Sequence, residues 1–263
     1  MAFMHCNFYS QALKSMTDIG VLIPSPEAGE EYFRLGVKFQ TLYAFHGAYG
    51  GWPDWLYKSN MERWAQKNKL AVVMPSAGNG FYQDMCHGER YLEFVTEELI
   101  AFAQTVFPLS PKREDNFTGG LSMGGYGALK AALTKPEQFS CAVSISGALD
   151  VAEMFKDIRR GEEPDPFRLW DIFQDPNHLE GTDADVFHLI KTLKSEGRPL
   201  PKMFLSCGTE DFLYRVNTGA RDKLKALGVD LHYEEHPGKH VWNYFSPNME
   251  RALGWLPLRR DYV

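Results

Sequence analysis

The order of apolar and polar residues predicts short β-strands that alternate with longer helices. Several runs, such as LAVVM and KMFLSC, are apolar or nearly so throughout, as is typical of strands buried on both faces of a sheet. The predicted strands are Ile19–Pro24, Gln40–Phe45, Leu70–Met74, Asn116–Gly119, Ser140–Ser146, Lys202–Cys207 and Asp230–Glu235.

Between these strands lie stretches with apolar residues at helical spacing or with many strong helix formers. The predicted helices are Trp55–Asn68, Glu89–Phe107, Ser122–Thr134, Arg215–Leu227 and Ser246–Leu256. Strands that alternate with helices form a mostly parallel sheet covered on both faces. The sequence therefore predicts the α/β class, with residues 1–263 forming one domain.

Residues 150–200 interrupt this alternation. They contain the proline- and acid-rich stretches GEEPDPF, QDPNH and EGTDAD, together with the aromatic residues Phe155, Phe167, Trp170 and Phe173. One interpretation is a long surface excursion with its own small apolar cluster. The other is a cap over the active site, since long insertions in compact domains often act as lids. The sequence leaves both open.

Composition and charge exclude several classes of protein. A chain of 263 residues with 44% hydrophobic content can bury one large core. The net charge of −6 and the lack of a basic run argue against a nucleic-acid partner. The N-terminal residues do not resemble a signal peptide, and no window approaches the roughly 18 apolar residues of a membrane span. We expect a cytoplasmic protein without a membrane partner; a homo-oligomer remains open.

The four cysteines are widely scattered, with no spacing typical of a zinc site. Cys141 and Cys207 lie in apolar runs and are expected to be buried. No motif for a metal or an organic cofactor is present, so we expect neither.

The strongest chemical motif is Gly120-Leu121-Ser122-Met123-Gly124, a G-x-S-x-G pattern between a predicted strand and a predicted helix. In that context a tight strand-to-helix turn exposes the serine hydroxyl above the carboxyl edge of the sheet. The N–H groups at the start of the helix face the same space and suit an oxyanion. We therefore predict that Ser122 is a nucleophile.

Upstream, the strand TLYAF runs into His46-Gly47-Ala48-Tyr49-Gly50. An HG-type turn at this place supplies the second donor of an oxyanion hole, so Ala48 and Met123 are the predicted donors. Glycine at position 47 allows the main chain to approach the substrate closely. His46 precedes the serine in the chain and is interpreted as a residue that stabilises the turn.

The acid and the base of a Ser-Asp-His set should follow the serine in that order. Asp211 comes after the strand KMFLSC and is preferred over Glu210, partly because its shorter side chain holds an imidazole more rigidly. Asp183 and Asp185 lack a preceding strand. Of His232, His236 and His240, the last follows the turn Pro237-Gly238 and is the predicted base.

Six segments in this order, HGAYGG, GNGFYQD, GGLSMGGYGALKAAL, SGAL, CGTEDFLY and GKHVWNYF, closely resemble the tributyrin esterase family, within the esterase D-like carboxylesterases of the α/β-hydrolase superfamily. The likeness runs from about Phe8 to Leu256. It implies a metal-free cytoplasmic carboxylesterase for short acyl chains, with Ser122, Asp211 and His240 as its triad.

The same resemblance suggests residues of the substrate pocket, namely Asn79, Phe81, Tyr82, Asp84 and Trp242; Gly47 is added to them because of the close approach that it allows. Aromatic residues in loops after strands are reasonable pocket walls, although they can equally pack the loop. Residues 150–200 match the family least and are expected to shape specificity.

Several functions share this set of residues. The first is hydrolysis of short-chain esters, including acetylated sugars or aryl esters, through an acyl-enzyme on Ser122. Thioesterase action on S-formylglutathione, feruloyl ester hydrolysis and acyl transfer to a sugar remain open. A carbohydrate-binding or interaction module without catalysis would need a broken triad, and the triad residues are all present here. The many aromatic residues, 18 Phe, 12 Tyr and 6 Trp, keep this alternative open.

Overall fold

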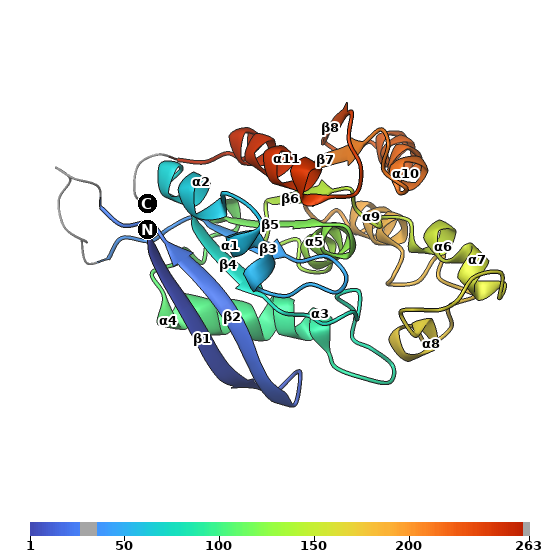
Figure 1. Cartoon of the computed structure of the whole chain (residues 1–263), viewed down its shortest axis with the longest axis horizontal. Coiled ribbons are helices and arrows are strands. Elements are labelled where there is room, and N and C mark those ends of the chain that lie inside the picture. Colours follow the sequence, from blue (N-terminus) through green and yellow to red (C-terminus); the bar gives the residue numbers. More distant parts are fainter. Residues whose placement is uncertain (27–35, 260–263) are drawn as a thin grey trace.

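The computed structural model describes residues 1–26 and 36–259 and contains an eight-stranded sheet in the order β1-β2-β4-β3-β5-β6-β7-β8. Figure 1 shows this sheet running through the middle of the molecule, with both termini at one end. The strands are β1 (Ala2–Ser10), β2 (Ser15–Ile23), β3 (Thr41–Phe45), β4 (Ala71–Pro75), β5 (Asn116–Leu121), β6 (Cys141–Ile145), β7 (Lys202–Gly208) and β8 (Leu231–His236).

The strands β3 to β8 are all parallel to one another. Strands β1 and β2 form an antiparallel hairpin at one edge of the sheet, and β2 runs antiparallel to β4. This arrangement confirms the predicted mostly parallel sheet. Strand β1 has no counterpart among the predicted strands. It lies at the edge of the sheet beside β2, and its side chains alternate between exposed and half-buried.

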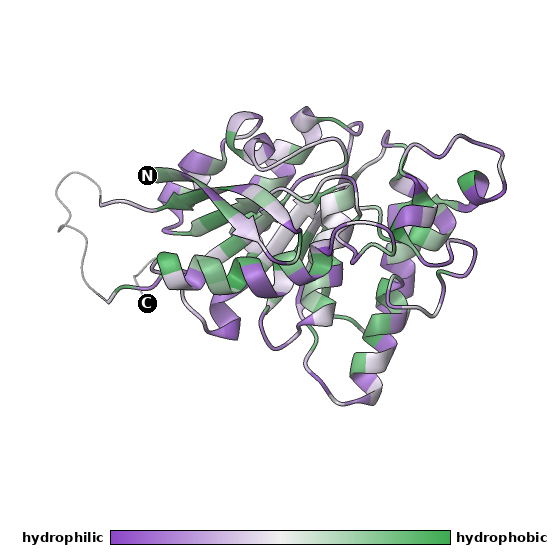
Figure 2. Cartoon of the chain, turned by 90° about the horizontal axis from the view of Figure 1, so that it is seen from below, coloured by the Kyte–Doolittle hydropathy of each residue, from purple (hydrophilic) through white to green (hydrophobic). Residues whose placement is uncertain are grey.

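Helices cover both faces of the sheet. The apolar cluster on one face includes side chains of α1 (Pro53–Tyr57), α2 (Met61–Lys67) and α11 (Trp242–Trp255). The cluster on the other face includes α4 (Leu99–Val106), α5 (Met123–Thr134), α9 (Val186–Ser195) and α10 (Tyr214–Ala226). Figure 2 shows the apolar strands enclosed between helices that carry hydrophilic segments.

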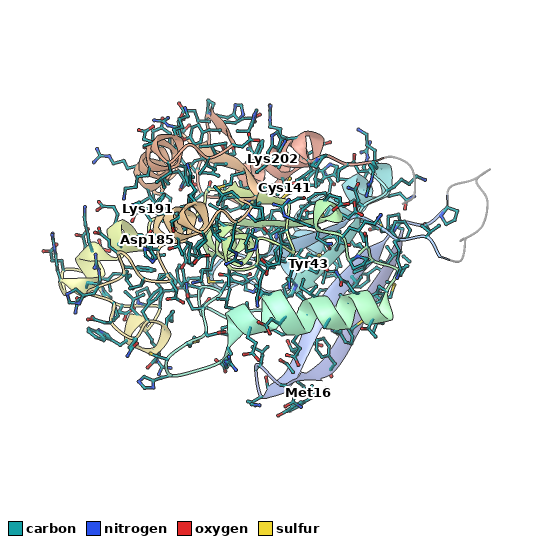
Figure 3. The ribbon with its side chains drawn as sticks, turned by 180° about the vertical axis from the view of Figure 1, so that it is seen from behind. Met16, Tyr43, Cys141, Asp185, Lys191 and Lys202 are labelled. Carbon is teal, nitrogen blue, oxygen red and sulfur yellow. The ribbon has the colours of Figure 1, made fainter. Side chains whose placement is uncertain are left out.

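Alternate residues of a strand serve the two faces, as the pleat requires. In β3, Leu42 and Ala44 join one cluster while Tyr43 and Phe45 join the other. Cys141 in β6 and Cys207 in β7 are 1% and 0% exposed, which confirms their predicted burial. Figure 3 shows Tyr43 and Cys141 within the body of the molecule and Met16 at the tip of the β1–β2 hairpin.

The segment predicted as one helix over Trp55–Asn68 is two helices, α1 and α2. Ser59 separates them, because its hydroxyl donates to the Trp55 carbonyl and accepts from the Met61 N–H at 3.1 Å. A serine that bonds the backbone in this way ends one helix and starts another.

The helix predicted over Glu89–Phe107 is continuous but not regular. It consists of α3 (Tyr91–Glu93), a π-helical segment (Phe94–Glu98) and α4. A short 3₁₀ turn, Arg113–Asp115, precedes β5. Helix α11 begins at Trp242, before the predicted start at Ser246, because Tyr244 and Phe245 are buried beneath the sheet and extend the helix despite Pro247 inside it.

Residues 150–200 form short helices, α6 (Val151–Met154), α7 (Lys156–Arg159) and α8 (Leu169–Ile172), before α9. Figure 1 places α6 to α8 at the end of the molecule opposite the termini. Phe155, Leu169 and Ile172 are buried within the main core cluster. The apolar residues of the excursion therefore extend the main core instead of forming a separate one.

Candidate active site

Ser122 lies at a sharp turn between β5 and α5, which end and begin at the two adjacent residues. Its backbone has φ 52° and ψ −121°, an unfavourable conformation for a residue with a side chain. The turn is held because the Ser122 N–H donates to the Ile145 carbonyl at 2.9 Å and the Ser122 carbonyl accepts from Ala148 at 3.1 Å. Strain of this kind is found where a reactive group must be presented.

The glycines on both sides of the turn are required by contact. A Cβ atom at Gly120 would lie 2.3 Å from the Gly124 carbonyl oxygen, and one at Gly124 would lie 2.4 Å from the His46 carbonyl oxygen. Both neighbours are backbone atoms and cannot move aside cheaply. The G-x-S-x-G pattern thus allows the turn to pack directly on the loop after β3.

His240 connects the serine to a carboxylate. Its Nε2 atom lies 2.9 Å from Ser122 Oγ, and its Nδ1 atom lies 3.0 Å and 2.8 Å from the two carboxylate oxygens of Asp211. The Asp211 side chain is fully buried, and the His240 side chain is 19% exposed. The structure therefore brings together the three predicted triad residues, from loops far apart in sequence.

Two backbone hydrogen bonds join the loops that carry the acid and the base. The Thr209 N–H donates to the His236 carbonyl at 2.9 Å, and the Glu210 N–H donates to the Gly238 carbonyl at 3.0 Å. The Asp211 carboxylate also accepts the Leu213 N–H at 2.8 Å. The Asp211–His240 pair consequently has its backbone fixed on both sides.

The competing candidates have other partners. His232 and His236 both contact Glu234, at 2.9 Å and 3.2 Å, and Glu210 is exposed. Asp183 pairs with Lys130, and Asp185 caps α9. Among the described residues none of these side chains is hydrogen-bonded to Ser122, whereas His240 is.

The predicted oxyanion donors face the serine from two sides. A Cβ atom at Gly47 would lie 3.4 Å from Ser122 Cβ and 2.5 Å from a Leu121 methyl carbon, so the loop passes directly beside the nucleophile. Met123 is the first residue of α5, and its N–H has no partner within the helix. The Ala48 N–H donates no hydrogen bond to any of the described residues. Both N–H groups are thus available to a ligand.

His46 is buried and holds this loop. Its Nε2 accepts the Ala77 N–H at 2.9 Å, so its Nδ1 carries the hydrogen and donates to the Gly47 carbonyl at 2.7 Å. Burial lowers the pKa of the imidazole, which keeps it neutral. The Tyr82 hydroxyl donates to the His46 carbonyl at 3.0 Å. His46 thus has the turn-stabilising position expected from sequence.

The structure corrects the expectation for two pocket residues. Phe81 and Tyr82 are 1% and 0% exposed, so they are core residues instead of pocket walls. Tyr82 stacks on Phe45 at 4.7 Å, and Phe81 packs edge-on against Phe155 and Phe167, both at 5.1 Å. Phe81 therefore anchors the excursion to the rest of the fold.

The other predicted pocket residues have varied surroundings. The Asn79 side chain accepts the Tyr49 N–H at 2.7 Å, which fixes the residue after Ala48. The Asp84 carboxylate accepts the Glu93 N–H at 3.0 Å. Asp84 also lines a groove beside the excursion, and none of the triad residues lines that groove. The Trp242 ring packs edge-on against Trp55 at 5.1 Å, between α11 and α1. A substrate role for Gly47 and Trp242 stays a prediction.

The excursion reaches the oxyanion loop through one aromatic pair. Phe167 stacks on Tyr49 at 5.9 Å, and Tyr49 is 70% exposed. From the other side, Tyr126 of α5 donates to the Ala184 carbonyl at 2.7 Å. The excursion is therefore attached both to the nucleophile helix and to the oxyanion loop, beside the site.

Phe212 is a site residue that was not predicted from the sequence. It follows Asp211 directly, is 71% exposed, and its ring centroid lies 4.5 Å from that of His240. The signal was present in the sequence: a large apolar residue in a polar loop next to the candidate acid.

Two further findings concern the part of the chain that the structure describes. Within residues 1–26 and 36–259, no group of three or more histidine, cysteine or acidic side chains could hold a metal ion. No helix among these residues is long and apolar enough to cross a membrane.

A sheet of this order with a hydrogen-bonded serine, histidine and aspartate at its carboxyl edge defines a serine hydrolase of the α/β-hydrolase class. Residues 10–256 match a family model described as putative esterase. The chain therefore belongs to this esterase family, which confirms the resemblance to esterases stated above.

The chain is also similar to individual proteins over nearly its whole length. It is 36% identical over 262 residues to an acetyl esterase of Caldicellulosiruptor saccharolyticus, covering 97% of this chain and 98% of the relative. The structure of the Staphylococcus aureus fluorophosphonate-binding serine hydrolase FphF has a TM-score of 0.89 at 29% identity, covering 97% and 98% of the two chains. That of the Staphylococcus aureus S-formylglutathione hydrolase FrmB has a TM-score of 0.85 at 29% identity, covering 97% and 98%.

Proposed function

We propose that this chain is a serine carboxylic ester hydrolase that cleaves esters of short acyl groups, acetyl and butyryl among them. The observation that carries the proposal is the position of His240, 2.9 Å from Ser122 Oγ and 2.8 Å from the Asp211 carboxylate. The similarity to an acetyl esterase over nearly the whole chain supports the choice of acyl group.

In the first half-reaction, Ser122 Oγ attacks the ester carbonyl carbon while His240 Nε2 takes the hydroxyl proton. The carbonyl oxygen becomes an oxyanion and accepts hydrogen bonds from the Ala48 and Met123 N–H groups. When the carbon–oxygen bond to the alcohol breaks, His240 returns the proton to the leaving oxygen. The product alcohol departs and the acyl group stays on Ser122.

In the second half-reaction, water takes the place of the alcohol. His240 accepts a proton from the water as its oxygen attacks the acyl-enzyme, and the collapse of the second oxyanion returns that proton to Ser122 Oγ. Asp211 fixes the imidazole tautomer and stabilises the imidazolium in both steps. The products are one carboxylic acid and one alcohol for each ester and water consumed.

A thioesterase reaction is a second candidate because the S-formylglutathione hydrolase FrmB is similar in structure. Its chemistry would use the same side chains, with a thiol as the leaving group. We further propose that the enzyme meets its small-molecule substrate in the cytoplasm, as the unpaired cysteines Cys6, Cys86, Cys141 and Cys207 suggest.

The decisive experiment compares hydrolysis rates of wild type and Ser122→Ala. The substrates are p-nitrophenyl acetate, butyrate and octanoate, acetylated xylo-oligosaccharide, methyl ferulate and S-formylglutathione. We expect the acetate and butyrate to react fastest and Ser122→Ala to be inactive. Activity that survives in Ser122→Ala would overturn the mechanism, and a preference for the thiol ester by orders of magnitude would favour the second candidate.

A further inference from the structure

Phe212 lies against the imidazole of His240 and is exposed to solvent. The His240 ring contacts two phenylalanines: Phe245 packs edge-on at 4.9 Å and is 4% exposed, whereas Phe212 lies at 4.5 Å and is 71% exposed. Phe245 belongs to the core beneath the sheet. Phe212 presents most of its ring to solvent while it contacts the imidazole.

The backbone around Phe212 is fixed. The Asp211 N–H donates to the Gly208 carbonyl at 3.1 Å, and the Tyr214 N–H donates to the Asp211 carbonyl at 3.0 Å. The next side chain, Leu213, is 3% exposed and anchors the turn in the core. Phe212 is thus an exposed apolar ring on a rigid turn, and burial of such a ring by a bound ligand removes apolar surface from water at little ordering cost.

The chemistry of the proposed reaction decides which part of the substrate Phe212 meets. His240 Nε2 must return its proton to the leaving oxygen, so that oxygen comes within roughly 2.6–3.2 Å of Nε2. The carbon atoms of the alcohol are attached to this oxygen and lie beside the imidazole. The acyl group is attached to the carbonyl carbon on Ser122 instead and remains there after the alcohol departs.

We propose that Phe212 is a specificity-determining residue for the alcohol part of the ester. Its exposed ring forms an apolar platform on which a flat or ring-shaped alcohol, such as a phenol or a pyranose, packs while its oxygen lies at His240. Small alcohols such as ethanol are too short to cover the ring. This inference rests on the proposed function, because it requires the serine mechanism with His240 as the proton donor.

The test varies the alcohol at constant acyl group. For Phe212→Ala and Phe212→Leu, kcat/KM is measured with phenyl acetate, an acetylated methyl glycoside and ethyl acetate, each relative to wild type. We expect Phe212→Ala to lower the values for the two ring alcohols about tenfold and to leave ethyl acetate nearly unchanged, with Phe212→Leu in between. Because each kcat/KM is divided by the wild-type value for the same ester, differences in the intrinsic reactivity of the esters cancel.

Two further measurements separate specificity from support of the triad. Ethyl acetate and ethyl butyrate should keep their wild-type ratio, since only the acyl group differs. The deacylation rate after a burst of p-nitrophenyl acetate should also be unchanged, because the alcohol has already left. Tyr9→Ala, which removes an aromatic ring that is 51% exposed on β1, is the matched control and should behave like wild type with every ester.

Each other outcome overturns the inference. An equal loss for all alcohols, or slower deacylation, would make Phe212 a support for His240. A changed ratio within the acyl series would place it on the acyl side, and wild-type behaviour would remove it from the site. Ser122→Ala is measured in parallel. Activity retained there would overturn the proposed function itself, whereas these other outcomes leave that function intact.

Discussion

Asp211 contacts the Nδ1 atom of His240 with both carboxylate oxygens, at 3.0 Å and 2.8 Å, from a fully buried position. A hydrogen on Nδ1 leaves Nε2 as the acceptor that faces Ser122. The carboxylate thus determines the tautomer that the proposed reaction needs. It also lies where a positive imidazolium would be stabilised in the transition state.

Replacing this carboxylate by an amide should preserve the shape of the site and remove its function. We expect Asp211→Asn to lower kcat about 10⁴-fold, as loss of the triad carboxylate does where the histidine takes the wrong tautomer. Steady-state kinetics with p-nitrophenyl acetate would measure it. Glu210→Gln is the matched control, since Glu210 is the adjacent acid and is exposed. A variant Asp211→Asn with kcat near the wild-type value would show that another group orients His240.

The proposed oxyanion hole can be tested at Ala48. Ala48→Pro removes the N–H donor, and we expect kcat to fall by about 10²–10³-fold with a smaller change in KM. Ala48→Gly keeps the N–H and should retain most of the activity. Thermal melting of both variants checks that the loop still folds. Equal activity of the two variants would exclude the Ala48 N–H from the reaction.

The parts of the site that could be predicted from the sequence are those with a local cause. Ser122 stands between a buried strand and a helix, and the glycines at 120 and 124 have no Cβ because backbone atoms lie 2.3–2.4 Å from where it would be. Asp211 and His240 follow strands, and in a parallel sheet the loops after neighbouring strands meet at one edge.

The parts that could not be predicted depend on contacts distant in sequence. Phe81 follows β4 in a loop that resembles a pocket wall, yet it is buried because Phe155 and Phe167 of the excursion cover it. The division between α1 and α2 depends on the rotamer of Ser59, which helical periodicity does not report. Strand β1 depends on pairing with β2 at the sheet edge.

Gly124 is closely packed behind the nucleophile and Gly219 is not, so we expect Gly→Ala substitutions at the two positions to have opposite effects on stability. Gly124→Ala would place a Cβ 2.4 Å and 2.5 Å from the His46 and Phe45 carbonyl oxygens, so we expect a loss of about 1–3 kcal/mol in the free energy of unfolding. Gly219 lies inside α10 with no atom within 4 Å of such a Cβ, and Gly219→Ala should add about 0.5–1 kcal/mol. Urea denaturation measures both. A stabilised Gly124→Ala would contradict the packing.

His46 should make the stability of the protein depend on pH. Burial lowers the pKa of its imidazole below the ordinary value of 6.5. Between pH 6.5 and the lowered pKa, the unfolded chain therefore binds a proton at this side chain, whereas the folded chain does not. The stability that neutral His46 contributes above pH 6.5 is consequently lost as the pH falls towards the lowered pKa.

The size of this effect is limited to one proton, which is about 1.4 kcal/mol per pH unit. His46→Gln does not titrate, and its amide oxygen can still accept the Ala77 N–H that His46 accepts. Urea denaturation gives the free energy of unfolding of wild type and variant at pH 7.5 and at pH 5.5. The change between the two pH values is then compared for the two proteins, so that contributions from the other histidines cancel. We expect wild type to lose more stability than His46→Gln over this interval. An equal or smaller loss in wild type would mean that His46 is protonated in the folded protein. A protonated Nε2 could not accept the Ala77 N–H. The loop that carries Ala48 would then be held in another way.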